Sequence, residues 1–415
     1  MKEFIVFLVL LAGAIAANSY GILPIDFATF FVFILVLGFL IYRDRKNVDF
    51  DKIVFIRRTK RGRNFIDHTA KRHMKFWHAL GTIGIAVCTV VLVLGSFYLI
   101  SMSYTVVTEK QGGLRLLLPG PVSAPTNLPG VFVMPWWIWI IGVAVVIVPH
   151  EFMHGIMCRI DKVRIKAVGW ILLLIIPGAF VEPDEKQLQK AKRGTKMRVY
   201  AAGSFANIIT AMIVLGIMFV YFSMSFTPAG AYIGVRNGTP AFDANLSGSI
   251  TEIGGMPVRS YQDIHDILDK YKPGDTIQVT TMANIITIPS FHAGWDFFSP
   301  RTAVIVNSTD VKTYSLTLTT SETGRPFMGV FYDSRYAPSS YSFNNQYIAA
   351  YMLLFWIYVF SFGIGIFNIL PMKPLDGGLL LEEIMGKKRK RIVTVVSVIM
   401  LLVILFNLIG PAVLR

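Results

Sequence analysis

Long apolar runs separated by shorter polar stretches dominate the pattern of this chain. A helix needs about 20 predominantly apolar residues to cross a bilayer, and the runs approach or exceed that length. They cover residues 4–17, 25–42, 77–100, 135–158, 199–222, 347–370 and 392–414. The pattern predicts a polytopic α-helical membrane protein with about seven spans. The first run is short, and its small-residue end at 14–17 leaves a cleaved signal peptide as an alternative.

Residues 227–346 break this pattern with shorter apolar segments and frequent turn residues. Strands are predicted at 231–235, 250–253, 276–281, 303–306 and 314–319. A helix is predicted at 260–271, because Ile264, Ile267 and Leu268 fall on one face. The segment is therefore expected to form an inserted mixed α/β domain between two spans.

Composition agrees with a membrane protein and excludes several other classes. The chain is 54% hydrophobic, and its mean hydropathy is positive. Cys88 and Cys158 lie in or beside apolar runs, so neither a disulfide framework nor a cysteine-based zinc site is expected. The net charge is +15, but residues 227–346 carry eight Lys/Arg and ten Asp/Glu. The positive excess thus belongs to the membrane portion, which argues against a nucleic-acid partner.

The positive charges orient the predicted spans. Twelve Lys/Arg lie in 43–75, ten in 159–198, and five in the run GKKRKR at 386–391. The positive-inside rule places these three segments in the cytoplasm. Counting spans between them places the domain at 227–346 outside the cell membrane.

Span four carries the candidate chemistry in the stretch VVIVPHEFMHGIM at 145–157. Ionisable residues in a span are costly and usually functional. The motif H-E-x-x-H puts His150 and His154 one turn apart on one helix face, where both can bind a Zn²⁺ ion. Glu151, one residue on, points about 100° around the helix, where it can reach a metal-bound water rather than the metal and take its proton as hydroxide attacks a carbonyl. Interhelical hydrogen bonding by the two histidines is the alternative.

A third zinc ligand is expected from the stretch NILPMKPLDGG at 368–378. Its prolines and glycines predict an unwound, buried loop that presents the carboxylate of Asp376. An ordinary span end with a solvated Asp376 is the alternative. His150 and His154 lie about 14 Å and 8 Å from the inner end of span four, at 1.5 Å per residue. Asp376 follows the inner end of span six, so all three groups are expected in the same leaflet.

Three motifs together resemble those of the site-2 protease family of intramembrane zinc metalloproteases. HEFMH, AGSFAN at 202–207 and NILPMKPLDGG occur in that order, and the resemblance covers about 135–386. It implies one catalytic zinc bound by His150, His154 and Asp376, with Glu151 as the general base. It also implies that Asn207 faces the active site, where it would bind the substrate backbone or the oxyanion. A packing hydrogen bond between spans is the alternative for Asn207.

The stretch VRIKAVGWILLLIIPGAFVEP at 163–183 has an apolar core too short to span a bilayer. The resemblance implies a re-entrant β-hairpin here. Its strand edge, including Gly178, would pair with an unwound substrate by β-augmentation. An interfacial amphipathic loop is the alternative.

The outside domain resembles a PDZ module, although Gly248-Ser249 replaces the more usual Gly-Asp. This implies either contact with peptides or a size filter for substrates. The predicted organisation is spans one and two in 1–42, a basic cytoplasmic loop in 43–75, span three with an outside loop in 76–134, a catalytic core of spans four and five with the hairpin in 135–226, the PDZ-like domain in 227–346, span six in 347–386, and a basic loop with span seven in 387–415.

The sequence thus predicts an intramembrane zinc endopeptidase of the cell membrane, with its active site toward the cytoplasmic leaflet. Its expected substrates are single-span membrane proteins, cut within or near the lipid bilayer. Two alternatives from other classes remain. One is a proton- or ion-coupled carrier that uses His150, Glu151 and Asp376 as a relay. The other is a catalytically inactive membrane scaffold that acts through its PDZ-like domain.

Overall fold

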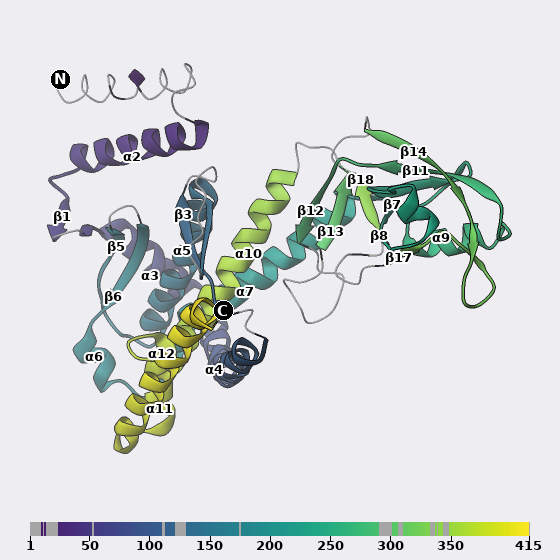
Figure 1. The fold of residues 1–415 in the computed structure, drawn as a ribbon. Helices are drawn as coiled ribbons and strands as arrows, with labels where there is room; N and C mark the ends of the chain where they lie inside the picture. Colours follow the sequence, from purple (N-terminus) through teal and green to yellow (C-terminus); the bar gives the residue numbers. More distant parts are fainter. Residues whose placement is uncertain are drawn as a thin grey trace. The chain divides into compact units, whose positions relative to one another are not determined.

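The computed structural model describes residues 10, 12–13, 24–51, 54–109, 113–120, 130–173, 176–289, 301–305, 310–332, 337, 339–342 and 348–414. The chain divides into two compact units (Figure 1). Unit 1 consists of residues 1–214 and 356–415, and unit 2 of residues 215–355. Apart from Leu10, Ala12 and Gly13, the first predicted span lies outside the described residues.

Six helices in the described part are long and apolar enough to cross a membrane. They are α2 (Ile25–Arg43), α4 (Met74–Glu109), α5 (Trp136–Ile160), α7 (Arg193–Ser225), α10 (Ile348–Ile369) and α12 (Lys390–Val413). Each contains most of one predicted run, from the second to the seventh. The helix α4 has 36 residues, or about 54 Å at 1.5 Å per residue. It therefore exceeds a bilayer core of about 30 Å, because polar residues continue the helix beyond the apolar run.

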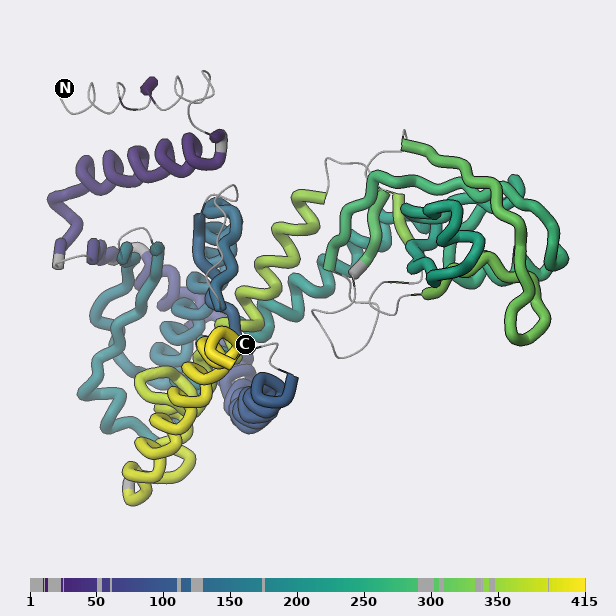
Figure 2. Tube along the Cα trace, viewed as in Figure 1, coloured from purple at the N-terminus to yellow at the C-terminus, as the bar shows by residue number. Residues whose placement is uncertain are grey.

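The segment 43–75 is not the simple basic loop that the charge pattern predicts. It forms β1 (Val48–Asp51), β2 (Val54–Thr59) and α3 (Lys60–Arg72). Strand β2 pairs with β5 (Ile165–Leu173), which pairs with β6 (Ile176–Pro183). The β5–β6 hairpin is thus half of a sheet with the order β1-β2-β5-β6, in which β2 lies beside β5 (Figure 2). Pairing across more than 100 residues leaves no local pattern that would reveal it.

Small residues let helices approach α5 closely in unit 1. A Cβ at Gly155 of α5 would lie 2.7 Å from Ile66 on α3. A Cβ at Gly81 of α4 would lie 2.5 Å from Met157 on α5. The core formed here also includes Ala201 and Ala202 of α7. Helix α5 is therefore packed against α3, α4 and α7, which fix its position in unit 1.

Helix α10 ends at Ile369, and α11 (Asp376–Met385) begins at Asp376. The prediction of an unwound stretch is right for residues 370–375, but Asp376 itself is the first residue of a helix. The glycines after it permit a tight reversal, since a Cβ at Gly377 would overlap the carbonyl oxygen of Ile369. The reversal brings the N-terminus of α11 back beside the end of α10.

Unit 2 is a mixed α/β domain, as its pattern predicts. Its main sheet has the order β12-β13-β18-β7-β9-β11-β14, with β10 paired to β9. Ser260 and Asp263 form a capping box at the start of α9 (Tyr261–Leu268), and Ile264, Ile267 and Leu268 are buried. The helix face predicted from the sequence is therefore confirmed.

The strands of this sheet are β7 (Thr227–Tyr232), β9 (Ser249–Ile253), β10 (Met256–Pro257), β11 (Thr276–Met282), β12 (Ile285–Pro289), β13 (Arg301–Ile305), β14 (Val311–Thr317) and β18 (Ser340–Ser342). Shorter pairs join β8 (Gly234–Val235) to β17 (Val330–Phe331) and β15 (Thr319–Thr320) to β16 (Pro326–Phe327). Helix α8 (Pro240–Asp243) also belongs to unit 2. Unit 1 also contains β3 (Leu116–Gly120), β4 (Val131–Pro135), α6 (Glu185–Lys190) and the 3₁₀ turn η1 (Lys387–Arg389).

Candidate metal centre

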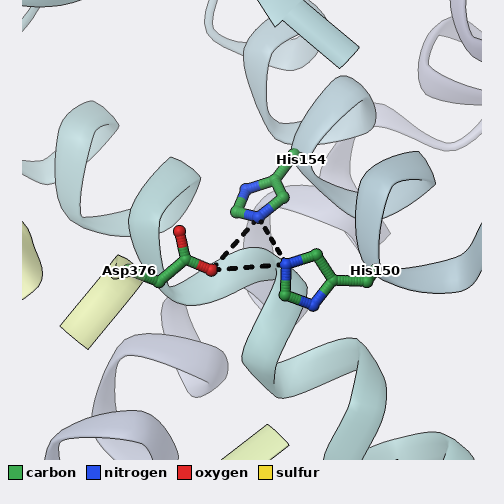
Figure 3. Close-up of side chains that lie close together, drawn as sticks. All are labelled: His150, His154 and Asp376. Atoms are coloured by element: carbon green, nitrogen blue, oxygen red, sulfur yellow. Dashed lines mark hydrogen bonds and ion pairs between the residues drawn. The ribbon is translucent and has the colours of Figure 1, made fainter. Parts of the chain in front are cut away.

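Three side chains from two helices converge on one point in unit 1 (Figure 3). His150 and His154 lie one turn apart on α5, and their Nε2 atoms are 3.2 Å apart. The Asp376 Oδ2 atom, at the start of α11, lies 3.5 Å from the Nε2 of His150 and 3.2 Å from that of His154. The structure thus brings together the three residues that the sequence predicts as metal ligands.

The dimensions of this triangle fit a zinc ion. Zinc bonds of about 2.0–2.1 Å in a tetrahedron place neighbouring ligand atoms about 3.3 Å apart. The observed edges are 3.2, 3.2 and 3.5 Å. In addition, the Oδ2 atom of Asp376 is buried, and among the described residues its polar neighbours are the two Nε2 atoms themselves. A bound cation would satisfy this carboxylate, which is otherwise costly to bury.

One face of α7 lies directly against the two imidazoles. Val199, Gly203 and Asn207 share this face, because they are four residues apart along a helix. The backbone oxygen of Val199 lies 2.7 Å from the Nδ1 of His154, and the Asn207 amide nitrogen lies 3.0 Å from the Nδ1 of His150. A Cβ at Gly203 would lie within 2.5 Å of both Nε2 atoms. The sequence motifs indicated Asn207 but not Val199 or Gly203. Their spacing at intervals of four residues before Asn207 is the signal that could have placed them on the same helix face.

Glu151 points toward the hairpin rather than into the triangle of ligands. Its Oε2 atom accepts a hydrogen bond from the backbone N–H of Val181 on β6, at 2.9 Å. That N–H must therefore point away from β5. Since backbone directions alternate along an antiparallel strand, Ala179 shares the direction of Val181. Gly178, paired with Ile171 of β5, turns its backbone groups inward instead.

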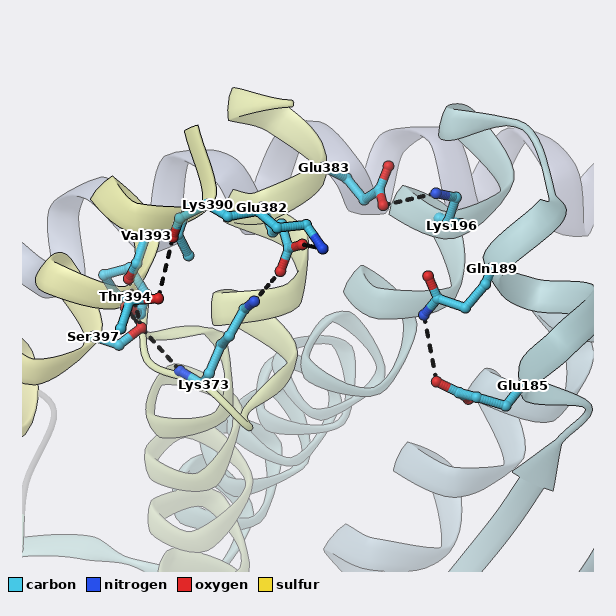
Figure 4. A network of polar contacts seen from close by, with 11 residues as sticks. Glu185, Gln189, Lys196, Lys373, Glu382, Glu383, Lys390, Val393, Thr394 and Ser397 are labelled. Carbon is cyan, nitrogen blue, oxygen red and sulfur yellow. Dashed lines mark hydrogen bonds and ion pairs between the residues drawn. The ribbon is translucent and has the colours of Figure 1, made fainter. Parts of the chain in front are cut away.

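The far end of α11 is anchored to the start of α7. The Arg193 guanidinium donates hydrogen bonds to the carbonyl oxygens of Glu383 and Ile384, both at 2.7 Å. Lys196 pairs with the Glu383 carboxylate at 2.8 Å (Figure 4). The Lys196 side chain is only 5% exposed. The helix that begins with Asp376 is therefore held by α7 at its other end.

A second ion-pair cluster links α11 to the residues on either side of it. The carboxylate of Glu382 bonds both Lys373 and Lys390 (Figure 4). Burial raises the pKa of Glu382, but the hydrogen bonds and positive charges of the two lysines outweigh it and hold this pKa below the usual range. The cluster thereby joins the reversal before α11, the helix itself and the start of α12.

Comparison with known proteins places this site in a family. The family model described as Peptidase family M50 matches residues 138–408, which is well over half of the chain. The chain belongs to Peptidase family M50, the site-2 protease family. The residues matched by the family model include His150, His154 and Asp376.

One similar protein and one similar solved structure give further context. The "Uncharacterized protein MJ0971" of Methanocaldococcus jannaschii is 26% identical over 351 residues, which cover 83% of this chain and 81% of that protein. The crystal structure of the PDZ domain of the SdrC-like protein (Lmo2051) from Listeria monocytogenes is 23% identical. That match covers 25% of this chain and 87% of the solved chain, with a TM-score of 0.18. Such a score does not establish a shared fold, and the PDZ-like nature of unit 2 stays a prediction.

Membership of the M50 family supports a membrane metalloprotease of the site-2 protease type. The long apolar helices agree with a multi-pass membrane protein. Metalloproteases of this family typically use zinc, and His150, His154 and Asp376 form a possible metal site. Neither the carrier nor the scaffold alternative is favoured by these observations.

Proposed function

We propose that this M50 protein is an intramembrane zinc endopeptidase that cleaves membrane-spanning substrates within or near the bilayer. The observation that carries the proposal is the triangle of His150 Nε2, His154 Nε2 and Asp376 Oδ2, with edges of 3.2–3.5 Å. Two of its corners lie on an apolar helix long enough to cross a membrane. Costly polar groups at such a position are best explained by catalysis.

The proposed division of labour follows from where the side chains lie. His150, His154 and Asp376 would hold the zinc, which supplies a Lewis acid and lowers the pKa of a water molecule. Glu151 would take the proton from that water and deliver it to the leaving amine. The hydrogen bond from Val181 holds the Glu151 carboxylate beside β6. The general base is thus kept at the strand where a substrate would be bound.

Strand β6 supports a mode of substrate binding. In the described sheet it is an edge strand, because its only neighbour is β5. The backbone groups of Ala179 and Val181 point away from β5, toward the edge where the Val181 N–H bonds Glu151. A helical substrate hides its peptide bonds in hydrogen bonds, so cleavage requires local unwinding. An unwound segment would regain hydrogen bonds by adding as a strand to this edge.

The charge pattern supports a location and an orientation. The positive-inside rule places the basic segments in the cytoplasm. The proposed active site then lies toward the cytoplasmic leaflet of the cell membrane, and unit 2 lies outside. Single-span membrane proteins are the proposed substrates, and unit 2 would bind their peptide segments or restrict their size.

The test is a cleavage assay on purified protein in lipid vesicles, with a model single-span substrate. Wild type and Glu151→Gln should each bind one zinc, and only wild type should cleave. Glu252→Gln, which changes an exposed carboxylate in unit 2, is the matched control and should cleave normally. A zinc chelator should stop cleavage, and added zinc should restore it. Cleavage by zinc-free protein, or by Glu151→Gln at the wild-type rate, would refute the proposal. Ion transport without cleavage would instead support the carrier.

A further inference from the structure

Asn207 is buried without exposed surface on α7 and contacts one of the proposed zinc ligands. Its amide lies 3.0 Å from the Nδ1 of His150. The other nitrogen of that ring, Nε2, faces His154 and Asp376. An imidazole whose Nε2 binds a metal carries its proton on Nδ1, and that N–H needs an acceptor. The partner of this N–H must therefore offer oxygen; the Asn207 amide can do so, and the Gly203 backbone oxygen also lies close enough to this imidazole to bond it.

A zinc ion on the Nε2 of His150 would require the Asn207 amide to be turned by half a rotation, so that oxygen faces the Nδ1–H. With Nδ2 toward His150, the Oδ1 atom of Asn207 is buried and has no partner among the described residues. The two ends of an amide have the same shape, so their partners decide which end faces the ring. Turning the amide places Oδ1 on the Nδ1–H of His150 and gives the oxygen a donor. The NH₂ group then faces the position that Oδ1 vacates.

The second histidine has an equivalent partner on the same face of α7. The Nδ1 of His154 lies 2.7 Å from the backbone oxygen of Val199, which can only accept a hydrogen bond. Val199 and Asn207 are eight residues apart, or about two helical turns. Gly203 lies midway and leaves room for the two rings. Helix α7 would thus supply one acceptor to each imidazole of the pair.

We infer that Asn207 is a positioning residue, whose Oδ1 accepts the Nδ1–H of His150 and fixes the tautomer and orientation of that ring for zinc. This inference rests on the proposed zinc site and assigns Asn207 a role that does not require substrate. Contacts of this kind typically change metal affinity by about 10- to 100-fold. The oxyanion or substrate role expected from the sequence would need a donor, so the two roles respond differently to substitution.

The experiment compares Asn207→Asp with Asn207→Leu in the full-length protein. Asp keeps an acceptor at the position and loses the NH₂ donor, whereas Leu has a similar size and loses both. Asn407→Leu is the matched control, since Asn407 is equally buried and bonds Leu99 and Ser103 on α4. The readouts are the zinc dissociation constant by chelator competition, the visible absorption of the Co²⁺-loaded protein, and the melting temperature without metal.

Asn207→Leu should weaken zinc binding by about 10- to 100-fold and change the Co²⁺ spectrum. Asn207→Asp should bind zinc at least as tightly as wild type, and Asn407→Leu should leave zinc affinity unchanged. Wild-type affinity in Asn207→Leu, or equal weakening in Asn207→Asp, would overturn the inference. The same holds if Asn407→Leu weakens zinc binding as much, since the loss would then be general destabilisation. A wild type that binds no zinc would instead refute the proposed function.

Discussion

Gly203 is the position where the smallest change should remove the metal. Built on the observed backbone, a Cβ would lie within 2.5 Å of the Nε2 atoms of both His150 and His154, whereas real Cβ atoms stay beyond 3.0 Å. Unless α7 shifts, both rings must therefore move by about 0.5 Å or more. Zinc–ligand distances tolerate deviations of only about 0.2 Å. We expect Gly203→Ala to weaken zinc binding by at least about 100-fold, or about 2.8 kcal/mol.

The measurement is zinc affinity by chelator competition, with zinc-dependent cleavage as the second readout. Gly216→Ala is the matched control, because Gly216 lies on the same helix and a Cβ there would meet nothing within 4 Å. Both changes improve helix propensity by about 1 kcal/mol. The metal-free protein should therefore be no less helical in either variant, and only Gly203→Ala should lose zinc.

A Gly203→Ala protein that binds zinc with wild-type affinity would refute the steric conflict at this position. That result would mean that α7 can move away from α5 without cost, or that zinc is not held by the two histidines. Equal losses of zinc in Gly203→Ala and Gly216→Ala would point to a general effect on α7 and would also contradict the steric argument.

Two predictions concern the anchoring of α11. Reversing the charge of one buried partner, Lys196→Glu, should destabilise the fold by about 3–5 kcal/mol in denaturant unfolding, and adding Glu383→Lys should restore most of the loss. A double variant no better than the single one would contradict a direct pair. Lys373 and Lys390 hold the pKa of Glu382 below its usual value. The ionised carboxylate therefore stabilises the fold fully at pH values above the ordinary glutamate pKa of about 4.3. This stabilisation is lost as the pH falls through the lowered pKa. Glu382→Gln should therefore melt below wild type at neutral pH, and the difference should shrink in acid; a difference that is constant with pH would refute the linkage.

Much of the membrane portion could be predicted from the sequence. The runs at 25–42, 77–100, 135–158, 199–222, 347–370 and 392–414 each contain most of a long apolar helix. Apolar length is a local property, because each residue of a span meets lipid or protein interior in its own right. The proximity of His150 and His154 could also be predicted locally, because residues four apart lie on one face of a helix.

Asp376 is an intermediate case. The residue type and the broken helix around it were visible in the sequence, and charge counting predicted that it lies in the same leaflet as the two histidines. Its position as the first residue of α11 was not visible. That position depends on the reversal after α10, where Gly377 packs against the carbonyl oxygen of Ile369.

Only the tertiary structure decided which groups surround the candidate ligands. The carbonyl of Val199, the gap at Gly203 and the N–H of Val181 belong to residues with no chemical signature of their own. The pairing of β2 with the hairpin joins segments more than 100 residues apart. Hydropathy and helical period depend on residues that are neighbours in the chain, so both can be read directly from the sequence. Close approach and backbone hydrogen bonding between distant segments arise from packing, which is defined only when the whole chain is folded.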